Sequence, residues 1–325
     1  MMAHQNQNGI MFLLPNATHI GVDESISRIL AAAFSHHPKI TQMSCHKGVK
    51  RISRDVFLSC PRLRKVVMLG VEVVERNAFL NCRHVTDIEC NELEMIERGA
   101  FYECVHLGGI YLPSARVVEQ HAFCFCAGMR HAIFGKDLES LGARAFYGCF
   151  SMERITVPLR DRLITDTDVF EGCRNLKHVD LVDEVHDTVS ALLCKDWRKD
   201  MNEEIHSINQ ALERIHADAP SDLHVVRVDY EKMAEAIQEW LGCVLHKIID
   251  YKAKHRLLLP KVADKLIELE LPNDVVVNHV LPYLELPLHM FDGEEPQVAA
   301  HKESGSDSRE GLQEQEEDWG EQEWH

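Results

Sequence analysis

The sequence lacks long hydrophobic runs and the pattern of an N-terminal leader. No apolar stretch reaches the roughly 20 residues that span a bilayer, because Pro260 and Lys261 interrupt the most hydrophobic one. Residues 1–14 contain no Lys or Arg, and the apolar run at residues 10–14 is shorter than the core of most signal peptides. We therefore expect a chain with no membrane span and no secretion signal, located in the cytoplasm.

A concentrated basic patch is also missing. The chain has 35 Lys and Arg against 52 Asp and Glu, a formal net charge of −17, and such a balance repels a phosphate backbone. Nucleic acid is not an expected partner. Residues 292–325 hold twelve of the acids against Lys302 and Arg309 and have almost no aliphatic residues, which predicts a disordered acidic tail. That tail is either a solubilising terminus or a peptide that docks on a basic partner.

Catalytic motifs are absent as well. The sequence has no glycine-rich phosphate loop ending in Lys, no His-Glu-x-x-His and no Gly-x-Ser-x-Gly. Cys124 and Cys126 form a lone Cys-x-Cys without the second ligand pair that a zinc site needs. We expect a protein that is not an enzyme and that holds no cofactor and no metal.

A repeat is the dominant feature that the sequence does contain. Phenylalanine recurs every 22 to 24 residues, at Phe34, Phe57, Phe79, Phe101, Phe123, Phe146 and Phe170. Three residues later stands a cysteine, or His37 in the first unit; the cysteines are Cys60, Cys82, Cys104, Cys126, Cys149 and Cys173. Each unit then continues with an apolar residue and a short alternating strand, for example Ile110 and Leu112.

One unit of this length cannot bury its own apolar face, but stacked units place equivalent residues in continuous inner ladders. The pattern begins near Thr18 and stops after Leu181. We therefore predict an α+β fold, in which a β-solenoid of about seven rungs of 22–24 residues is followed by an α-helical domain. The predicted division is an N-terminal segment at 1–17, the solenoid at 18–182, the helical domain at 183–291 and the tail at 292–325.

The repeat resembles the BspA-type leucine-rich repeat. Its consensus of Phe-x-x-Cys-x-x-Leu-x-x-Ile-x-Leu, closed by Ile-x-x-x-Ala-Phe, is matched at residues 96–101 and 104–113. The whole chain is similar to repeat proteins of unicellular algae in which helices follow the array, with an Asn-Gln pair at Asn209 and Gln210 and a Leu-Glu-Leu-Pro element at residues 284–287. This resemblance implies a leucine-rich repeat solenoid that takes part in protein–protein interaction without catalysis.

The eleven cysteines are either free thiols or are paired in disulfides. Equivalent residues of neighbouring rungs point in parallel rather than toward each other, which disfavours disulfides along the ladder. A free cysteine packs well as a small apolar residue. We expect buried, reduced thiols, and disulfides in a secreted chain are the alternative.

The outward side of the strands is the candidate partner-binding surface. Apolar residues are expected there in the middle of the array, bordered by charged ones, as in the centre and rim of an interface. The candidate residues are Lys65, Val67, Leu69, Glu89, Tyr111, Ile133 and Arg154. Two alternatives are that the helical domain covers this surface or that the apolar residues form no contiguous patch.

The helical domain shows two apolar stripes at helical spacing, from about Val185 to Ile215 and from Met233 to Leu259. We expect Pro260 to end or kink the second helix and a shorter helix to follow. The stripes either pack on each other and cap the solenoid, which favours a monomer, or form a coiled-coil homodimer. The leading function is a non-catalytic scaffold that binds other proteins through the strands, and the alternatives are a structural oligomer and a cell-surface adhesin.

Overall fold

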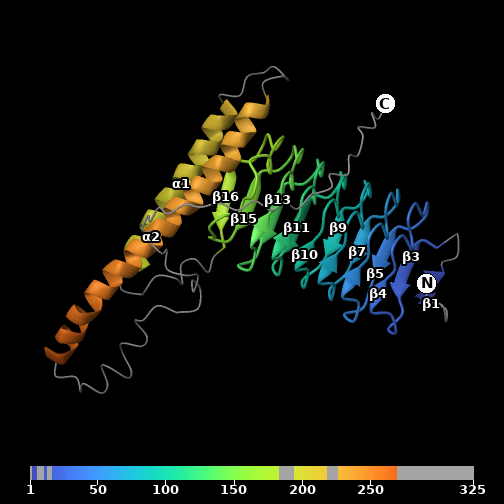
Figure 1. Cartoon of the computed structure of the whole chain (residues 1–325), viewed down its shortest axis with the longest axis horizontal. Helices are drawn as coiled ribbons and strands as arrows, with labels where there is room; N and C mark the ends of the chain where they lie inside the picture. Colours follow the sequence, from blue (N-terminus) through green and yellow to red (C-terminus); the bar gives the residue numbers. More distant parts are fainter. Residues whose placement is uncertain (1, 6–10, 13–16, 183–193, 218–225, 269–325) are drawn as a thin grey trace, which may run out of the picture. The chain divides into compact units, whose positions relative to one another are not determined.

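The computed structural model describes residues 2–5, 11–12, 17–182, 194–217 and 226–268. A stack of parallel strands is followed by two long helices (Figure 1), so the predicted solenoid with C-terminal helices is confirmed. The strands are β1 (Met2–Gln5), β2 (Met11–Phe12), β3 (His19–Val22), β4 (Arg28–Ile29), β5 (Gln42–Ser44), β6 (Arg51–Ile52), β7 (Lys65–Val67), β8 (Val73–Val74), β9 (Asp87–Glu89), β10 (Met95–Ile96), β11 (Gly109–Leu112), β12 (Val117–Val118), β13 (His131–Phe134), β14 (Ser140–Leu141), β15 (Arg154–Val157) and β16 (His178–Leu181).

Neighbouring rungs pair position by position. The longer strands form the sheets β2-β1-β3-β5-β7-β9 and β11-β13-β15-β16, and the two-residue strands form β14-β12-β10-β8-β6-β4. Every pairing between rungs is parallel, and Tyr111, for example, lies beside Ile133. Residues at one position of the repeat therefore stand in a column that runs along the array.

The phenylalanine column is the centre of the core. All seven rings are buried, and consecutive centroids lie 5.2 Å apart from Phe34 to Phe101 and 6.0 Å apart between Phe146 and Phe170. From Phe57 onward the planes of successive rings are nearly parallel, at angles of 9°, 2°, 1°, 8° and 12°. The repeat period thus becomes one continuous apolar stack.

The long turn around each phenylalanine uses left-handed backbone. Around Phe79, the residues two before and two after it, Asn77 and Asn81, have φ of 56° and 61°. Gly99 and Glu103 do the same around Phe101, with φ of 65° and 56°. Asparagine and glycine tolerate this region better than other residues do, and Glu103 adopts it as well, so the left-handed turn belongs to the rung rather than to one residue type.

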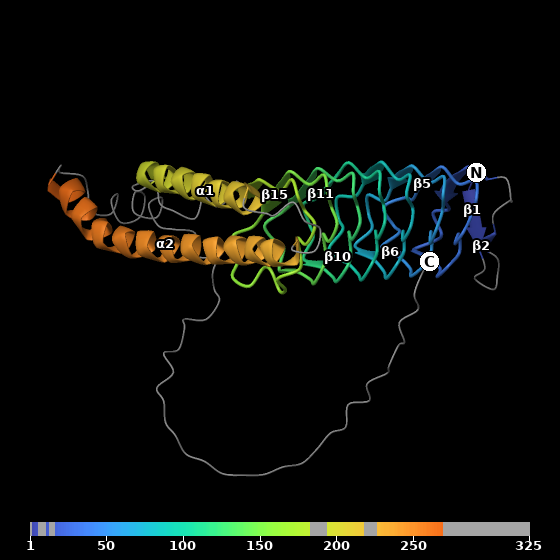
Figure 2. The ribbon, with the colours of Figure 1, turned by 90° about the horizontal axis from the view of Figure 1, so that it is seen from above.

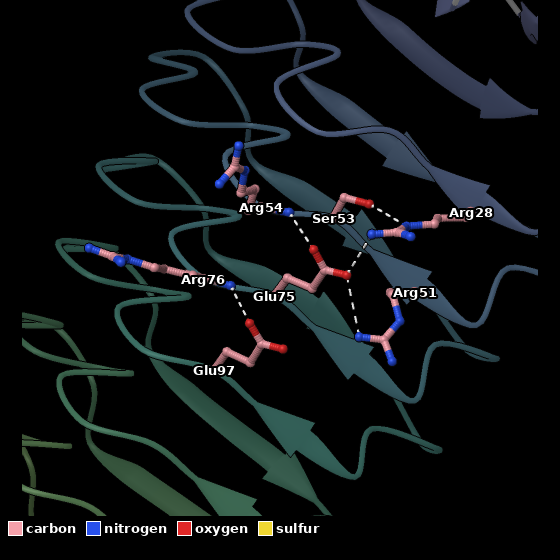
Figure 3. Close-up of polar contacts among 7 residues, drawn as sticks. All are labelled: Arg28, Arg51, Ser53, Arg54, Glu75, Arg76 and Glu97. Carbon is pink, nitrogen blue, oxygen red and sulfur yellow. Dashed lines mark hydrogen bonds and ion pairs between the residues drawn. The ribbon is translucent and has the colours of Figure 1, made fainter. Parts of the chain in front are cut away.

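Glutamate carboxylates connect these turns by hydrogen bonds to the backbone of the preceding rung. Glu75 Oε2 accepts a hydrogen bond from the backbone N–H of Arg54 at 3.0 Å, and Glu97 Oε2 accepts one from Arg76 at 3.0 Å (Figure 3). Glu75 Oε1 also accepts from Arg28 and Arg51, at 3.0 and 3.3 Å (Figure 3). One glutamate thus satisfies a backbone donor and offsets the charge of two arginines from other rungs.

The helices are α1 (Cys194–Ala217) and α2 (Val226–Glu268), and they run antiparallel beside each other (Figure 2). Trp197 near the start of α1 packs against Tyr251 in α2 with ring centroids 5.4 Å apart. The Tyr251 hydroxyl donates a hydrogen bond to Asp200 at 2.8 Å, and Lys247 forms an ion pair with Glu204 at 2.6 Å. The apolar stripes therefore face each other within one chain.

Of the two outcomes expected at Pro260, the end of the helix is wrong, and so is the separate shorter helix beyond it. The helix α2 continues through Pro260 to Glu268, and the kink stays a prediction. A proline removes one helical N–H, but Pro260 is exposed, where water can hydrate the carbonyl that loses its partner. The start of the first predicted stripe at residues 185–193 and the acidic tail at 292–325 lie outside the described residues.

The helical pair closes the last rung of the solenoid. Asn209 Oδ1 accepts a hydrogen bond from the backbone N–H of Val179 in β16 at 3.0 Å, and Gln238 Oε1 accepts one from Ile164 at 3.1 Å. The ring of His216 donates from Nε2 to the carbonyl of Leu176 at 2.6 Å. Side chains of both helices thus take the place of a further rung.

Candidate functional site: a groove on the strand face

The predicted binding residues stand on the outward side of β7, β9, β11, β13 and β15, which we call the strand face. The pairing register places Val67 beside Glu89. It places Tyr111, Ile133, Thr156 and Asp180 in one row across the four-stranded sheet. These two parts of the strand face belong to different sheets, because no pairing joins β9 to β11 among the described strands.

In the β7–β9 part of the strand face, the charged side chains form ion pairs with each other. Lys65 Nζ lies 2.5 Å from Glu89 and 3.2 Å from Asp87, and its hydrogen bonds to Glu89 and Asp87 raise the pKa of the lysine. Val67 and Leu69 beside them are half-buried. This part of the strand face is an ion-paired surface, and its four predicted residues are not among those that line the groove described next.

At the β11–β16 part, a groove of about 700 Å³ lies between the strand face and α1. Its strand side includes Tyr111, Ile133 and Thr156, and its helix side is formed by Met201 and Ile205. Tyr111 is 57% exposed. The structure thus brings two of the predicted residues together with two helical side chains that were predicted only as part of an apolar stripe.

Arg154 stands at the rim of this groove. It forms an ion pair with Asp180, which itself lines the groove. Because the pair bridges β15 and β16, it fixes the polar border next to the apolar residues. Of the predicted set, Tyr111 and Ile133 therefore lie in the groove and Arg154 beside it.

Backbone rather than side chain forms part of the groove lining. A Cβ atom placed on Gly135 would lie 1.8 Å from the carbonyl oxygen of Pro113, and both residues line the groove. Only glycine permits this close approach of the two chain segments. A glycine here is a weak signal in the sequence, since the other rungs have a side chain at this position.

The cysteine column is sealed from solvent. Each ladder thiol lies close to the carbonyl oxygen of a phenylalanine in the preceding rung, for example Cys82 Sγ to Phe57 at 3.0 Å and Cys126 Sγ to Phe101 at 3.2 Å. Burial raises the pKa of Cys126 well above its ordinary value. The ladder cysteines carry free thiols, as do Cys45, Cys90, Cys124 and Cys243, and Cys243 in α2 is exposed. The ladder thiols are therefore packing groups of the core.

Cys124, the other half of the lone Cys-x-Cys, is also buried. Burial raises the pKa of its thiol to about 12. A buried neutral thiol is poorly suited to ligate a metal or to attack a substrate.

Among the described residues, no helix is both long enough and apolar enough to cross a membrane.

Comparison with solved structures finds bacterial repeat proteins. The leucine-rich repeat protein of T. pallidum is 19% identical over 56% of this chain and 78% of its own, with a TM-score of 0.37. One from Bacteroides ovatus is 20% identical over 51% of this chain and 61% of its own, with a TM-score of 0.33. A leucine-rich cell surface protein of Faecalibacterium prausnitzii is 14% identical over 50% and 79%, with a TM-score of 0.20.

The sequence comparisons are more specific. A search of the curated proteins finds no match to the chain. The sequence profile described as BspA type leucine-rich repeat region matches in six copies, over residues 10–117 and 94–195. These matches span more than half of the chain and follow the same column of phenylalanine and cysteine that builds the core. The chain belongs to the BspA-type leucine-rich repeat family.

Proposed function

We propose that this chain is a non-catalytic scaffold that binds another protein through the groove between the strand face and α1. The observation that carries the proposal is the exposure of Tyr111 at the edge of this groove, with Ile133 beside it and Met201 and Ile205 opposite. Large aromatic side chains contribute strongly to protein interfaces when a partner covers them. The occupant is an apolar segment of a partner protein, oriented by the Arg154–Asp180 pair at the rim.

The family supports the class of function, because stacked repeats offer an extended surface for protein contacts. The ion-paired part of the strand face at Lys65 and Glu89 is less suited to this role, since a partner would have to replace contacts that the chain already makes. We therefore place the binding site at the helical end of the array.

A structural oligomer built through the helices is the second candidate. It is favoured by Ile249 and Leu257 in α2, which are 62% and 70% exposed and lie eight residues apart, on one side of the helix. Against it, the most apolar side chains of the helices, including Trp197, Leu212 and Leu241, are buried within the chain. We propose a monomer.

A cytoplasmic location is part of the proposal. Buried thiols that pack as small apolar groups are compatible with a reducing compartment, and the ladder cysteines are free thiols. An adhesin would instead be found on the cell surface. Fractionation of cells, followed by detection of the chain in the soluble or the surface fraction, separates these two possibilities.

The test of the groove is affinity capture with three forms of the full chain. These are the unchanged chain, a double variant Tyr111→Ala with Ile133→Ala, and a matched double variant Val67→Ala with Leu69→Ala on the same face but outside the groove. We expect the groove variant to lose a partner that the other two forms retain. Equal capture by all three forms would overturn the groove as the binding site.

Sedimentation of the unchanged chain and of the variant Ile249→Glu tests the oligomer. We expect the mass of one chain for both at micromolar concentration. A dimer that Ile249→Glu returns to a monomer would establish the second candidate, because a charge in an apolar helix contact is costly.

A further inference from the structure

A second unusual surface lies on the long turns of the middle and later rungs, away from the groove. Four aromatic side chains stand there, Tyr102, Phe125, Tyr147 and Phe150, and we call them the aromatic ridge. The first three are half-buried and Phe150 is 42% exposed. The ridge is separate from the phenylalanine column, whose rings are fully enclosed, so the core does not require these aromatic rings.

The rings of the ridge are arranged edge to face. The centroids of Tyr102 and Phe125 lie 5.7 Å apart with planes at 81°, and those of Phe125 and Tyr147 lie 5.1 Å apart with planes at 86°. The guanidinium of Arg144 lies 5.8 Å from the centre of the Tyr147 ring, and that of Arg174 lies 5.6 Å from the centre of Phe150. The surface is therefore made of ring edges and planar groups on successive rungs.

The backbone of Phe125 is strained. Its φ is 58°, in the left-handed region that costs a residue with a bulky side chain roughly 1–2 kcal/mol. At the equivalent turn position, neighbouring rungs have Glu103 and Gly148. Phe125 stays half-exposed in spite of this conformational cost, which indicates a role other than stabilising the fold.

A pocket of about 400 Å³ opens on the ridge, lined by Tyr102, Phe125, Tyr147, Arg144 and Glu171 among others. The charge of Arg144 is offset, because its Nε lies 2.8 Å from Asp168. Within the described part of the chain, no cation pairs with the carboxylate of Glu171. The pocket thus combines aromatic walls with one carboxylate that lacks an ion-pair partner there.

We propose that the aromatic ridge binds a proline-rich segment of a partner protein in the polyproline II conformation, with a basic residue of that segment on Glu171. Aromatic grooves bind such segments because the conformation is preformed and presents its rings and carbonyls outward. Charge complementarity at Glu171 selects a segment with an adjacent Arg or Lys.

The spacing of the ridge fits this occupant. Tyr102 and Tyr147 lie two rungs apart, which is about 10 Å at roughly 4.8 Å per rung, and one three-residue turn of polyproline II advances about 9 Å. Successive prolines three residues apart can therefore contact the two tyrosines. Burial raises the pKa of Tyr102 to about 12, so its hydroxyl stays protonated and can donate to a carbonyl of the segment.

The test measures fluorescence anisotropy of labelled nine-residue peptides with the full chain. The first peptide has two arginines followed by proline-rich triplets, the second replaces the arginines by glutamates, and the third replaces the prolines by glycines. We expect the first peptide to bind, and at least tenfold weaker binding of the second and third.

Variants of the chain complete the test. Tyr102→Ala with Tyr147→Ala should abolish binding of the first peptide, Glu171→Gln should reduce it and remove the preference over the glutamate peptide, and Tyr111→Ala in the groove should leave it unchanged. Circular dichroism of each variant establishes that it is folded. No binding of the first peptide at millimolar protein, or equal binding by the folded double tyrosine variant, would overturn the proposal without affecting the groove.

Discussion

The solenoid and the helical pair are held together in different ways. In the solenoid each contact is repeated, as in the ring stack through Phe79 and Phe101 and the thiol contact from Cys82 to Phe57. In the helical pair each contact occurs once, as between Trp197 and Tyr251. A repeated contact spreads stability over the array, whereas a contact that occurs once makes the pair depend on particular residues. We therefore expect a single substitution in the helical pair to act locally.

The largest expected difference between the two regions is thiol accessibility. Cys243 in α2 is exposed, whereas the ladder cysteines are buried. A buried thiol reacts only when the array opens, and a stability of about 5 kcal/mol leaves roughly one molecule in 5,000 open. Alkylation at pH 8 followed by peptide mass spectrometry should therefore label Cys243 before any ladder cysteine, and rapid labelling of Cys104 would contradict the burial of the ladder.

The second prediction concerns the ring stack. Phe101→Ala should lower the free energy of unfolding by about 3–5 kcal/mol, because it removes a large enclosed ring and leaves a cavity. Urea denaturation followed by circular dichroism measures the loss. The matched control is Phe150→Ala on the aromatic ridge, which should cost much less, and equal losses for the two variants would contradict the assignment of Phe101 to the core.

The third prediction concerns the junction between the regions. Asn209→Ala leaves the N–H of Val179 without its acceptor, and an unsatisfied buried donor costs about 1–3 kcal/mol. Hydrogen exchange should show faster exchange at the Val179 amide and little change at the middle rungs. Gln210→Ala, at the neighbouring exposed position, is the control and should leave that amide protected.

The smallest expected effect tests the left-handed turns. Ala32 is exposed and has φ of 55°, so Ala32→Gly should raise stability by up to about 1 kcal/mol as the strain is relieved. Ala31→Gly, one residue earlier and without a positive φ, should lower stability by about 0.5–1 kcal/mol. A loss at both positions in thermal melts would show that the turn is not strained at Ala32.

The repeated region could be predicted in detail from the sequence. The column of Phe101, its cysteine partner Cys104 and the inward pair Ile110 and Leu112 all have the burial that their spacing predicts. The prediction of burial was possible because the same physical requirement, an apolar side chain facing the next rung, recurs in seven repeats. The outward residues Tyr111 and Ile133 followed from the alternation of strand side chains.

The groove could be predicted only in part. Met201 and Ile205 were visible as apolar positions of a helix, but the sequence offers no period that tells which of them faces α2 and which faces the strands. The predicted end of the helix at Pro260 was wrong for a related reason, since a local rule for proline is outweighed in a long helix with an exposed proline.

The solenoid, its inner ladders and the antiparallel succession of two amphipathic helices follow from the sequence alone, because these features depend on periodic burial. The place where the helices dock depends on tertiary contacts, which are the single hydrogen bonds of Asn209, His216 and Gln238 to the last rungs. Tertiary contacts also bring Tyr111 to the groove that Met201 lines from the other side. These contacts join residues far apart in the chain and occur once, so no pattern in the sequence can reveal them.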